Sequence, residues 1–127
     1  MEKTPELKEV KHIEWTTPLP VDAPVKSSKF LLLDYECILK LSLASTRSTF
    51  GEYKHCVMHV YSDRKFAFPI DVTVYILQNN NIPAELSRTS LTETEIWKCS
   101  LSRIQKYATN SLVQFGVTFH FQYEGEF

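Results

Sequence analysis

Residues 113–123, with the sequence VQFGVTFHFQY, decide the fold class. Apolar side chains alternate with small or polar ones along this stretch, which predicts a long strand with one face in a hydrophobic core. Residues 37–43 and 68–76 alternate in the same way. Turn-forming residues separate these segments at short intervals, which leaves no room for the helical crossovers of parallel strands. The pattern predicts an all-β antiparallel sandwich or barrel, and we expect a β-sandwich of about seven to eight strands with one short helix.

Less regular segments complete the expected order of elements. A short strand over 10–15 precedes a proline-rich loop or edge, because proline cannot donate to a strand ladder. Residues 44–52 predict a polar loop. Residues 53–62 predict a strand whose inward face the alternation leaves undecided. Residues 83–95 predict a long loop, which leads into a short strand around 96–99.

The single helical candidate covers 100–108, where Ser100 could cap a short apolar stripe. Residues 1–9 are polar, and we expect them to form a flexible N-terminal segment. Residues 10–127 then form one domain, because a chain of this length usually has a single core.

Glycine content and charge exclude several classes of protein. The chain of 127 residues has three glycines, Gly51, Gly116 and Gly125, whereas a phosphate or dinucleotide loop needs several that are closely spaced. The net charge of −1 gives no electrostatic reason to expect a nucleic acid or an anionic membrane as partner. The sequence also lacks the run of about 18 apolar residues that a membrane-spanning helix requires.

The cysteines and the N-terminal segment indicate the compartment. Cys37, Cys56 and Cys99 are an odd, widely spaced set, which is typical of buried thiols in a reducing environment. Residues 1–12 are charged where a signal peptide would have its apolar region. We therefore expect an intracellular protein, cytoplasmic or nuclear.

No group of residues matches the pattern of a catalytic or metal site. His55 and His59 are the strongest candidates, but on a strand their rings are about 13 Å apart, while zinc ligands lie about 2 Å from the metal. Cys56 faces away from both histidines and cannot pair with them as a nucleophile. Acidic pairs lie in a predicted loop and near the end of the chain, and no nucleophile elbow is present. We expect no enzyme, no metal and no cofactor.

Three further features concern binding surfaces. Tyr53, Tyr61 and Tyr75 could form an aromatic strip that stacks bases, but few basic residues interleave with them, and we expect no nucleic-acid partner. Gly116 interrupts the longest predicted strand, which indicates a kink, a bulge or a close approach by another backbone. Trp97 follows a polar loop, from where its ring could fill the end of the sandwich or line a peptide groove.

The order of these features resembles the MATH domain, the TRAF-C-like sandwich of TRAF adaptors and of the MATH-BTB substrate adaptors of cullin ubiquitin ligases. The likeness covers most of 10–123. It is carried by five stretches, namely 12–15 (HIEW), 27–30 (SSKF), 38–43, 53–78 and 97–123. The opening strand lacks the family's usual Asn-Phe, and a Trp-Gly-Phe-like step appears here as Trp97-Lys98-Cys99.

The resemblance implies a non-enzymatic protein-interaction module that binds short extended peptides and recruits substrates or adaptors in ubiquitin or signalling assemblies. The family's aromatic-lined peptide groove falls by position on Val57, Val72, Trp97 and Cys99, of which only Trp97 is aromatic. A short serine-rich peptide would therefore find a shallower and less specific site. Backbone pairing would supply affinity and side-chain pockets would supply selectivity. A ligase-adaptor role would come from a larger parent chain or a partner chain.

Three alternatives stay open. A C2-like sandwich that binds lipid or calcium needs aspartates clustered at one end, and the chain offers Asp22, Asp34, Asp63 and Asp71. A purely structural domain that forms homo-oligomers is the second alternative, because TRAF relatives trimerise. A hydrolase built on a β-sandwich is the third, although no convergent polar site is evident in the sequence.

Overall fold

The computed structural model of the chain describes residues 6–20, 23–67, 69–78, 82–91 and 94–123. Its strands are β1 (Glu6–Pro18), β2 (Val25–Lys26), β3 (Phe30–Leu32), β4 (Tyr35–Ser48), β5 (Gly51–Ser62), β6 (Ile70–Leu77), β7 (Pro83–Ser90), β8 (Glu95–Ser100) and β9 (Leu112–Tyr123). A helical turn, α1 (Leu101–Ile104), continues as a 3-10 turn, η1 (Gln105–Tyr107).

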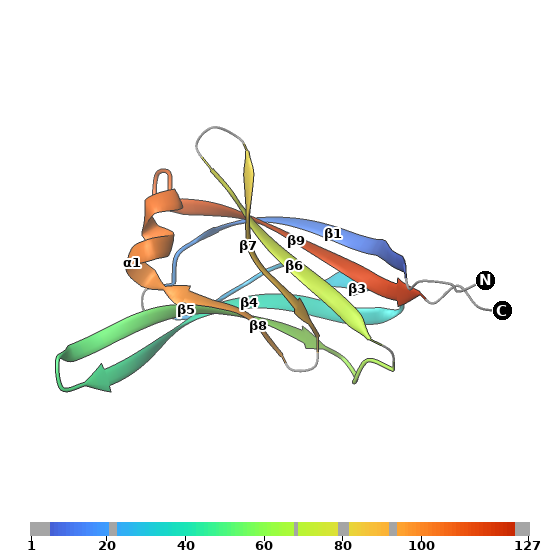
Figure 1. Cartoon of the computed structure of the whole chain (residues 1–127), viewed down its shortest axis with the longest axis horizontal. Coiled ribbons are helices and arrows are strands. Elements are labelled where there is room, and N and C mark those ends of the chain that lie inside the picture. Colours follow the sequence, from blue (N-terminus) through green and yellow to red (C-terminus); the bar gives the residue numbers. More distant parts are fainter. Residues whose placement is uncertain (1–5, 21–22, 68, 79–81, 92–93, 124–127) are drawn as a thin grey trace.

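Two antiparallel sheets form a sandwich (Figure 1). The four-stranded sheet has the order β1-β9-β6-β7, and the five-stranded sheet has the order β2-β4-β5-β8 with β3 paired to β4. Figure 1 shows the two sheets as stacked layers, with α1 at one end of the sandwich. The prediction of an all-β antiparallel sandwich with one short helix is confirmed, and the short strands β2 and β3 account for the larger number of strands.

The alternation seen in the sequence places one face of each long strand in the core between the sheets. Phe115 and Phe119 of β9 are completely buried, and the ring of Trp97 packs edge-on against Phe115 at 5.6 Å between centroids. Each such side chain contributes about 1.5–3 kcal/mol by leaving water. The inward face of β5, which the sequence left undecided, includes Met58, because Met58 lies opposite the buried Leu41 of β4.

The stretch predicted as a polar loop over 44–52 is instead a two-stranded arm. β4 and β5 continue to pair there, with Ser45 opposite Lys54 and Arg47 opposite Glu52, and the ribbon extends past the rest of its sheet (Figure 1). The side chains of residues 44–54, which we call the arm, are exposed on both faces. Backbone hydrogen bonds alone define these strands, so no half-buried alternation marks them in the sequence.

A second stretch predicted as a loop, 83–95, contains β7. This strand is the edge of the four-stranded sheet, and its ladder with β6 shifts register between Val74 and Tyr75. Ala84 and Leu86 are only partly buried against the core, so the strand lacks a regular apolar alternation. The Ser87 hydroxyl donates to the carbonyl oxygen of Ile96 at 3.2 Å and ties β7 to β8.

The remaining predicted elements are found with altered bounds. β8 confirms the short strand expected around 96–99, and α1 with η1 occupies most of the helix expected over 100–108. Ser100 is at the N-cap position, but its side chain makes no capping hydrogen bond. β1 begins at Glu6, four positions before the expected Val10, because its early residues pair with the end of β9; residues 1–5 lie outside the described part.

Candidate functional site

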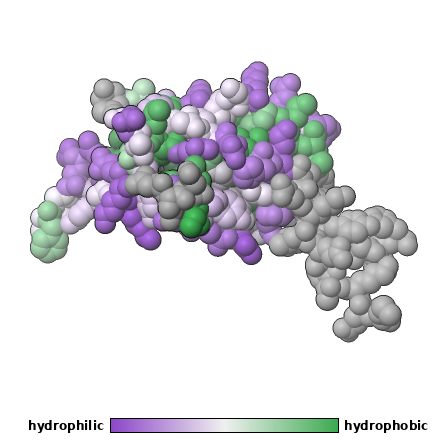
Figure 2. All heavy atoms as spheres, turned by 90° about the horizontal axis from the view of Figure 1, so that it is seen from above, coloured by the Kyte–Doolittle hydropathy of each residue, from purple (hydrophilic) through white to green (hydrophobic). Residues whose placement is uncertain are grey.

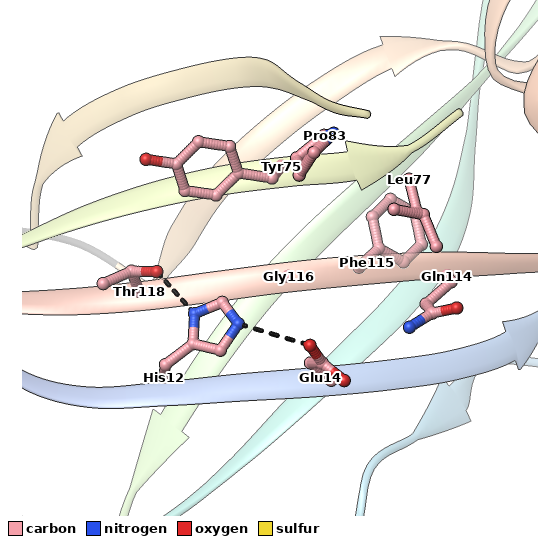
Figure 3. A pocket seen from close by; sticks show the side chains of 9 residues that line it. All are labelled: His12, Glu14, Tyr75, Leu77, Pro83, Gln114, Phe115, Gly116 and Thr118. Atoms are coloured by element: carbon pink, nitrogen blue, oxygen red, sulfur yellow. Dashed lines mark hydrogen bonds and ion pairs between the residues drawn. The ribbon is translucent and has the colours of Figure 1, made fainter. Parts of the chain in front are cut away.

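A hollow of about 270 Å³ opens on the outer face of the four-stranded sheet (Figure 3). The hollow draws its lining from all four strands of this sheet, because their outward side chains meet above β9. The lining residues are His12, Glu14, Tyr75, Leu77, Pro83, Gln114, Phe115, Gly116 and Thr118.

Gly116 forms the floor of the hollow. It lies opposite Glu14 of β1 on one side and Tyr75 of β6 on the other, and both ladders pass through it in regular register. The expected kink or bulge is therefore wrong. A close approach does occur, but a side chain makes it: a Cβ at position 116 would lie 3.2 Å from His12 Cε1. The edge of this imidazole takes up part of the room that glycine leaves, and the rest stays open as the hollow.

His12 is held in place by its neighbours on the rim. Its Nδ1 shares a hydrogen bond of 2.7 Å with Thr118 Oγ1, and its Nε2 lies 3.9 Å from Glu14 Oε1 (Figure 3). The His12 side chain is 41% exposed, so a ligand in the hollow can reach the ring. Tyr75 lies across the hollow from the imidazole (Figure 3). The rim thus combines an aromatic wall with fixed hydrogen-bonding groups.

A second hollow, of about 590 Å³, adjoins the first toward the end of the sandwich that carries η1. The two hollows share Leu77 and Gln114, and together they form what we call the β9 groove. Tyr107 and Leu112 lie at its far end. From Thr118 to Leu112 the groove follows β9 for about 20 Å at the usual rise of an extended strand.

The turn that closes the far end of the groove is a tight one. Asn110 and Ser111 both have positive φ, at 52° and 66°, and Thr109 and Leu112 exchange two backbone hydrogen bonds of 2.8 and 3.0 Å across them. This is the geometry of a type I′ hairpin turn. It sets where β9 begins and therefore where the groove ends.

The four residues of the predicted peptide site are placed in two different sheets. Val57 of β5 lies opposite Lys98 of β8, and Trp97 and Cys99 are the residues on either side of Lys98, so these three are neighbours along the ladder. Val72 is on β6 of the other sheet and is completely buried. Trp97 is 6% exposed, so its ring fills the core instead of lining an open groove. A peptide on the surface would meet little of this set in the observed conformation.

Two of the aspartates named for a calcium site meet at one end of the sandwich. Arg64 lies between them: its guanidinium is 2.6 Å from Asp34 Oδ2 and 3.2 Å from Asp63 Oδ2, and it stacks over the ring of Tyr35 at 4.2 Å. The guanidinium thus occupies the place that a cation would take. Asp71 lies on β6, where its carboxylate accepts a hydrogen bond from the Ser90 hydroxyl of β7. Asp22 lies outside the described residues. Within the described ranges, no three His, Cys, Asp or Glu side chains are grouped as metal ligands would be.

The tyrosines of the expected aromatic strip do not lie on one surface. Tyr53 and Tyr61 are on β5, whereas Tyr75 is on β6 in the other sheet. Tyr61 stacks on His59 at 5.8 Å, and the Lys40 amine lies 5.7 Å from the Tyr61 ring. The structure therefore offers two separate aromatic surfaces, and of these three tyrosines Tyr75 is the one that borders the β9 groove.

One face of the molecule is mainly polar. Figure 2 shows one face, on which hydrophilic side chains predominate and apolar ones form separate patches. None of the helical residues that the structure describes forms a segment with the length and hydropathy needed to cross a lipid bilayer.

A comparison with models of known protein families finds no match to this chain, and a comparison with curated proteins finds none either. The class that the fold and the groove define is therefore a β-sandwich with an open, partly apolar groove on its four-stranded sheet. The MATH resemblance stays a prediction.

Proposed function

We propose that this β-sandwich is a non-enzymatic protein-interaction module that binds a short extended segment of a partner protein in the β9 groove. The observation that carries the proposal is the open floor at Gly116, which lies between Tyr75 and the fixed imidazole of His12. An open floor with an aromatic wall accepts a side chain, and hydrogen-bonding groups on the rim orient it.

The dimensions of the groove favour a peptide over a small molecule. Pockets for drug-sized ligands usually have volumes of about 300–1,000 Å³ and enclose most of the ligand. The hollow at Gly116 has about 270 Å³ and fits one large side chain, and the adjoining hollow has about 590 Å³. Both are open to solvent, so neither encloses a ligand as a small-molecule pocket does. The adjoining hollow continues along β9 over about 20 Å, the length of roughly six extended residues.

The lining indicates what the peptide would carry. Leu77, Pro83 and Tyr75 present apolar surface to the first hollow, so we expect an apolar or aromatic anchor residue there. The Gln114 amide lies between the two hollows and can donate to or accept from the peptide backbone. Glu14 is 70% exposed on the rim and favours a basic residue beside the anchor.

This placement differs from the predicted site at Val57, Val72, Trp97 and Cys99. The β9 groove is preferred because it is open, whereas Val72 and Trp97 are buried in the core. A role in recruiting substrates or adaptors for ubiquitin or signalling assemblies is part of the proposal, and its support is the MATH resemblance. An intracellular location is proposed as well, because Cys37, Cys56 and Cys99 are free thiols.

A library of short peptides that carry a central aromatic or branched apolar residue tests the proposal. Binders would be titrated into the isotope-labelled chain, and amide shifts would be mapped by nuclear magnetic resonance. We expect the shifts to follow β9, the facing residues of β1 and β6, and the turn at Asn110. The variant Tyr75→Ala should weaken binding by at least tenfold, whereas Tyr61→Ala, a matched change on the other sheet, should leave it unchanged.

Other shift patterns would overturn this assignment in distinct ways. Shifts confined to β5 and β8 would favour the predicted set around Trp97. Shifts at Asp34 and Asp63 on addition of calcium would favour the C2-like alternative. Concentration-dependent self-association without peptide binding, measured by light scattering, would favour the purely structural one.

A further inference from the structure

The pairing of β5 with β8 brings two cysteines together that are far apart in the sequence. Cys56 lies directly opposite Cys99 in the antiparallel ladder, so both side chains point to the same face. Both contact the hydrophobic core, where Cys56 is completely buried and Cys99 is half-buried at the margin. The helical turn α1 starts two residues after Cys99.

We propose that Cys56 and Cys99 form a reversible dithiol–disulfide site that is oxidised by low-molecular-weight disulfides of the glutathione class. This inference is independent of the peptide groove, which lies on the other sheet.

The geometry of the ladder satisfies the requirements of a disulfide. Directly opposed residues of an antiparallel pair have Cα atoms about 4.5 or 5.5 Å apart, and both values fall within the range of disulfide-linked cysteines, about 4.4–6.8 Å. The Cβ atoms, about 4.5–5.5 Å apart in such a pair, must approach to about 3.8 Å, so β8 must move toward β5 by about 0.7–1.7 Å. Among the strands of the described residues, β8 is the edge of the five-stranded sheet and pairs with β5 alone, so it can make this adjustment.

The two thiols differ in access, which sets the order of the steps. The thiolate of the half-buried Cys99 attacks one sulfur of the oxidant, forms a mixed disulfide and releases one small thiolate. The Cys56 thiolate then attacks the Cys99 sulfur, which forms the protein disulfide and releases the second small thiolate. The two protein thiols lose two electrons to the oxidant, and their two protons end on the released thiols.

The second step should be slow at neutral pH. In the reduced protein, burial, and then the nearby charge of Cys99, raise the pKa of Cys56 from 9.0 to about 11. Burial, the larger cause, persists in the mixed disulfide, where Cys99 carries no charge, so few molecules carry the Cys56 thiolate at pH 7. Closure of the mixed disulfide should therefore accelerate about tenfold per pH unit between pH 7 and 9.

Cys37 provides an internal control. Like Cys56 it is buried on the inward face of a central strand, but the residue opposite Cys37 on β5 is Ser62, and on β3 it is Phe30. It therefore lacks a thiol at either directly paired position. The variant Ser62→Cys would supply one and tests the geometric argument itself.

The experiment treats the whole folded chain with oxidised glutathione. The remaining thiols are then blocked with N-ethylmaleimide in denaturant, and the digested chain is examined by mass spectrometry. We expect a peptide pair that joins Cys56 to Cys99, with Cys37 blocked, and loss of the link after dithiothreitol. The variant Cys99→Ser should form no link. Its near-ultraviolet circular dichroism should match that of the wild type, which would show that the variant is folded.

Two results would overturn the proposal. One is a wild-type chain that accumulates glutathione on Cys99 without forming the link, even at pH 9. The other is a link that includes Cys37 or joins two chains. If the variant Ser62→Cys forms a new disulfide at Cys37, direct cross-strand pairing is sufficient for a disulfide in this sheet. If neither this disulfide nor the Cys56–Cys99 disulfide forms, the argument from direct cross-strand pairing is wrong.

Discussion

The imidazole of His12 occupies the space beside Gly116 that a side chain at position 116 would need. A Cβ there would lie 3.2 Å from His12 Cε1 and 3.6 Å from Nε2. The two residues are diagonal neighbours on β1 and β9, since His12 lies directly opposite Thr118 and Gly116 lies opposite Glu14. The depth of the β9 groove therefore depends on one glycine and on the position of one histidine ring.

The variant Gly116→Ala should separate stability from binding. Alanine is preferred over glycine in a strand by about 0.5–1 kcal/mol, while the displaced end of the His12 side chain offsets part of this gain. We expect the free energy of unfolding to change by less than about 1 kcal/mol. Peptide affinity should fall by tenfold or more, because the added methyl group fills the floor of the groove. Urea unfolding and peptide titration measure the two effects, and equal peptide affinity in variant and wild type would show that the floor is not used.

The variant Ser111→Gly should stabilise the protein. Ser111 has a positive φ of 66° in the turn between Thr109 and Leu112, and Asn-Gly is the preferred pair for this type of turn. Relief of the left-handed strain outweighs the added freedom of the unfolded chain, and we expect a gain of about 0.5–1 kcal/mol. Thermal unfolding provides the measurement. Ser45→Gly, at an exposed strand position of the arm without positive φ, is the matched control and should destabilise.

The variant Arg64→Ala should loosen the end of the sandwich where Asp34 and Asp63 meet. Its side chain is 46% exposed, so the ion pairs contribute little each, and the stacking on Tyr35 adds about 0.5–1 kcal/mol. We expect a total loss of about 1–1.5 kcal/mol, part of which high salt should also remove from the wild type. Arg64→Lys retains the charge but not the planar stack, and it should recover less than half of the loss. An unchanged unfolding midpoint in Arg64→Ala would contradict this account.

Stability should fall in alkaline solution because of the buried thiols. Burial raises the pKa of Cys37 and Cys56 from 9.0 to about 11, with added contributions from the charges of Asp63 and Cys99 respectively. Below pH 9 both thiols keep their protons in the folded and unfolded states. Between pH 9 and 11 the unfolded chain loses these protons first, which lowers the free energy of unfolding by ~2 kcal/mol per thiol.

Denaturant titrations at pH 8 and 10.5 would measure this loss. The variant Cys37→Ala removes one of the two thiols, and its stability should drop by ~2 kcal/mol less than that of the wild type over the same interval. Equal drops in the two proteins would show that ionisation of Cys37 does not contribute.

The strands that alternation predicts are those with a buried face. β6 and β9 lie inside the four-stranded sheet, and Val74 and Val117, which lie opposite each other, are both completely buried. The alternation does not predict the arm or β7, because neither has a continuous buried face. Thr46 lies opposite Tyr53 in a ribbon exposed on both faces, and β7 is a polar edge strand. Cross-strand hydrogen bonds, which leave no periodic trace in the sequence, define these segments.

The groove could be anticipated only in part. Gly116 stands out as a glycine in a regular alternation, which predicts a close approach by another backbone, whereas a side chain makes the observed approach. The identity of the approaching group follows from the register of β1 on β9, and His12 and Thr118 are separated by 106 positions in the chain. Local pattern does not fix that register. The pairing of Cys56 with Cys99 could not be predicted from the sequence for the same reason, because it depends on the register of β8 on β5.

The pairing of β1 with β9 also has a consequence for how the protein is made. β9 lies between β1 and β6, so the four-stranded sheet is incomplete until the last described strand has left the ribosome. The hairpin of β4 and β5 needs only local contacts and can form early, whereas β1 must wait for a partner about 100 residues away. During synthesis one edge of β6 lacks its hydrogen-bonded neighbour β9, and we expect the nascent chain to rely on chaperones over this interval.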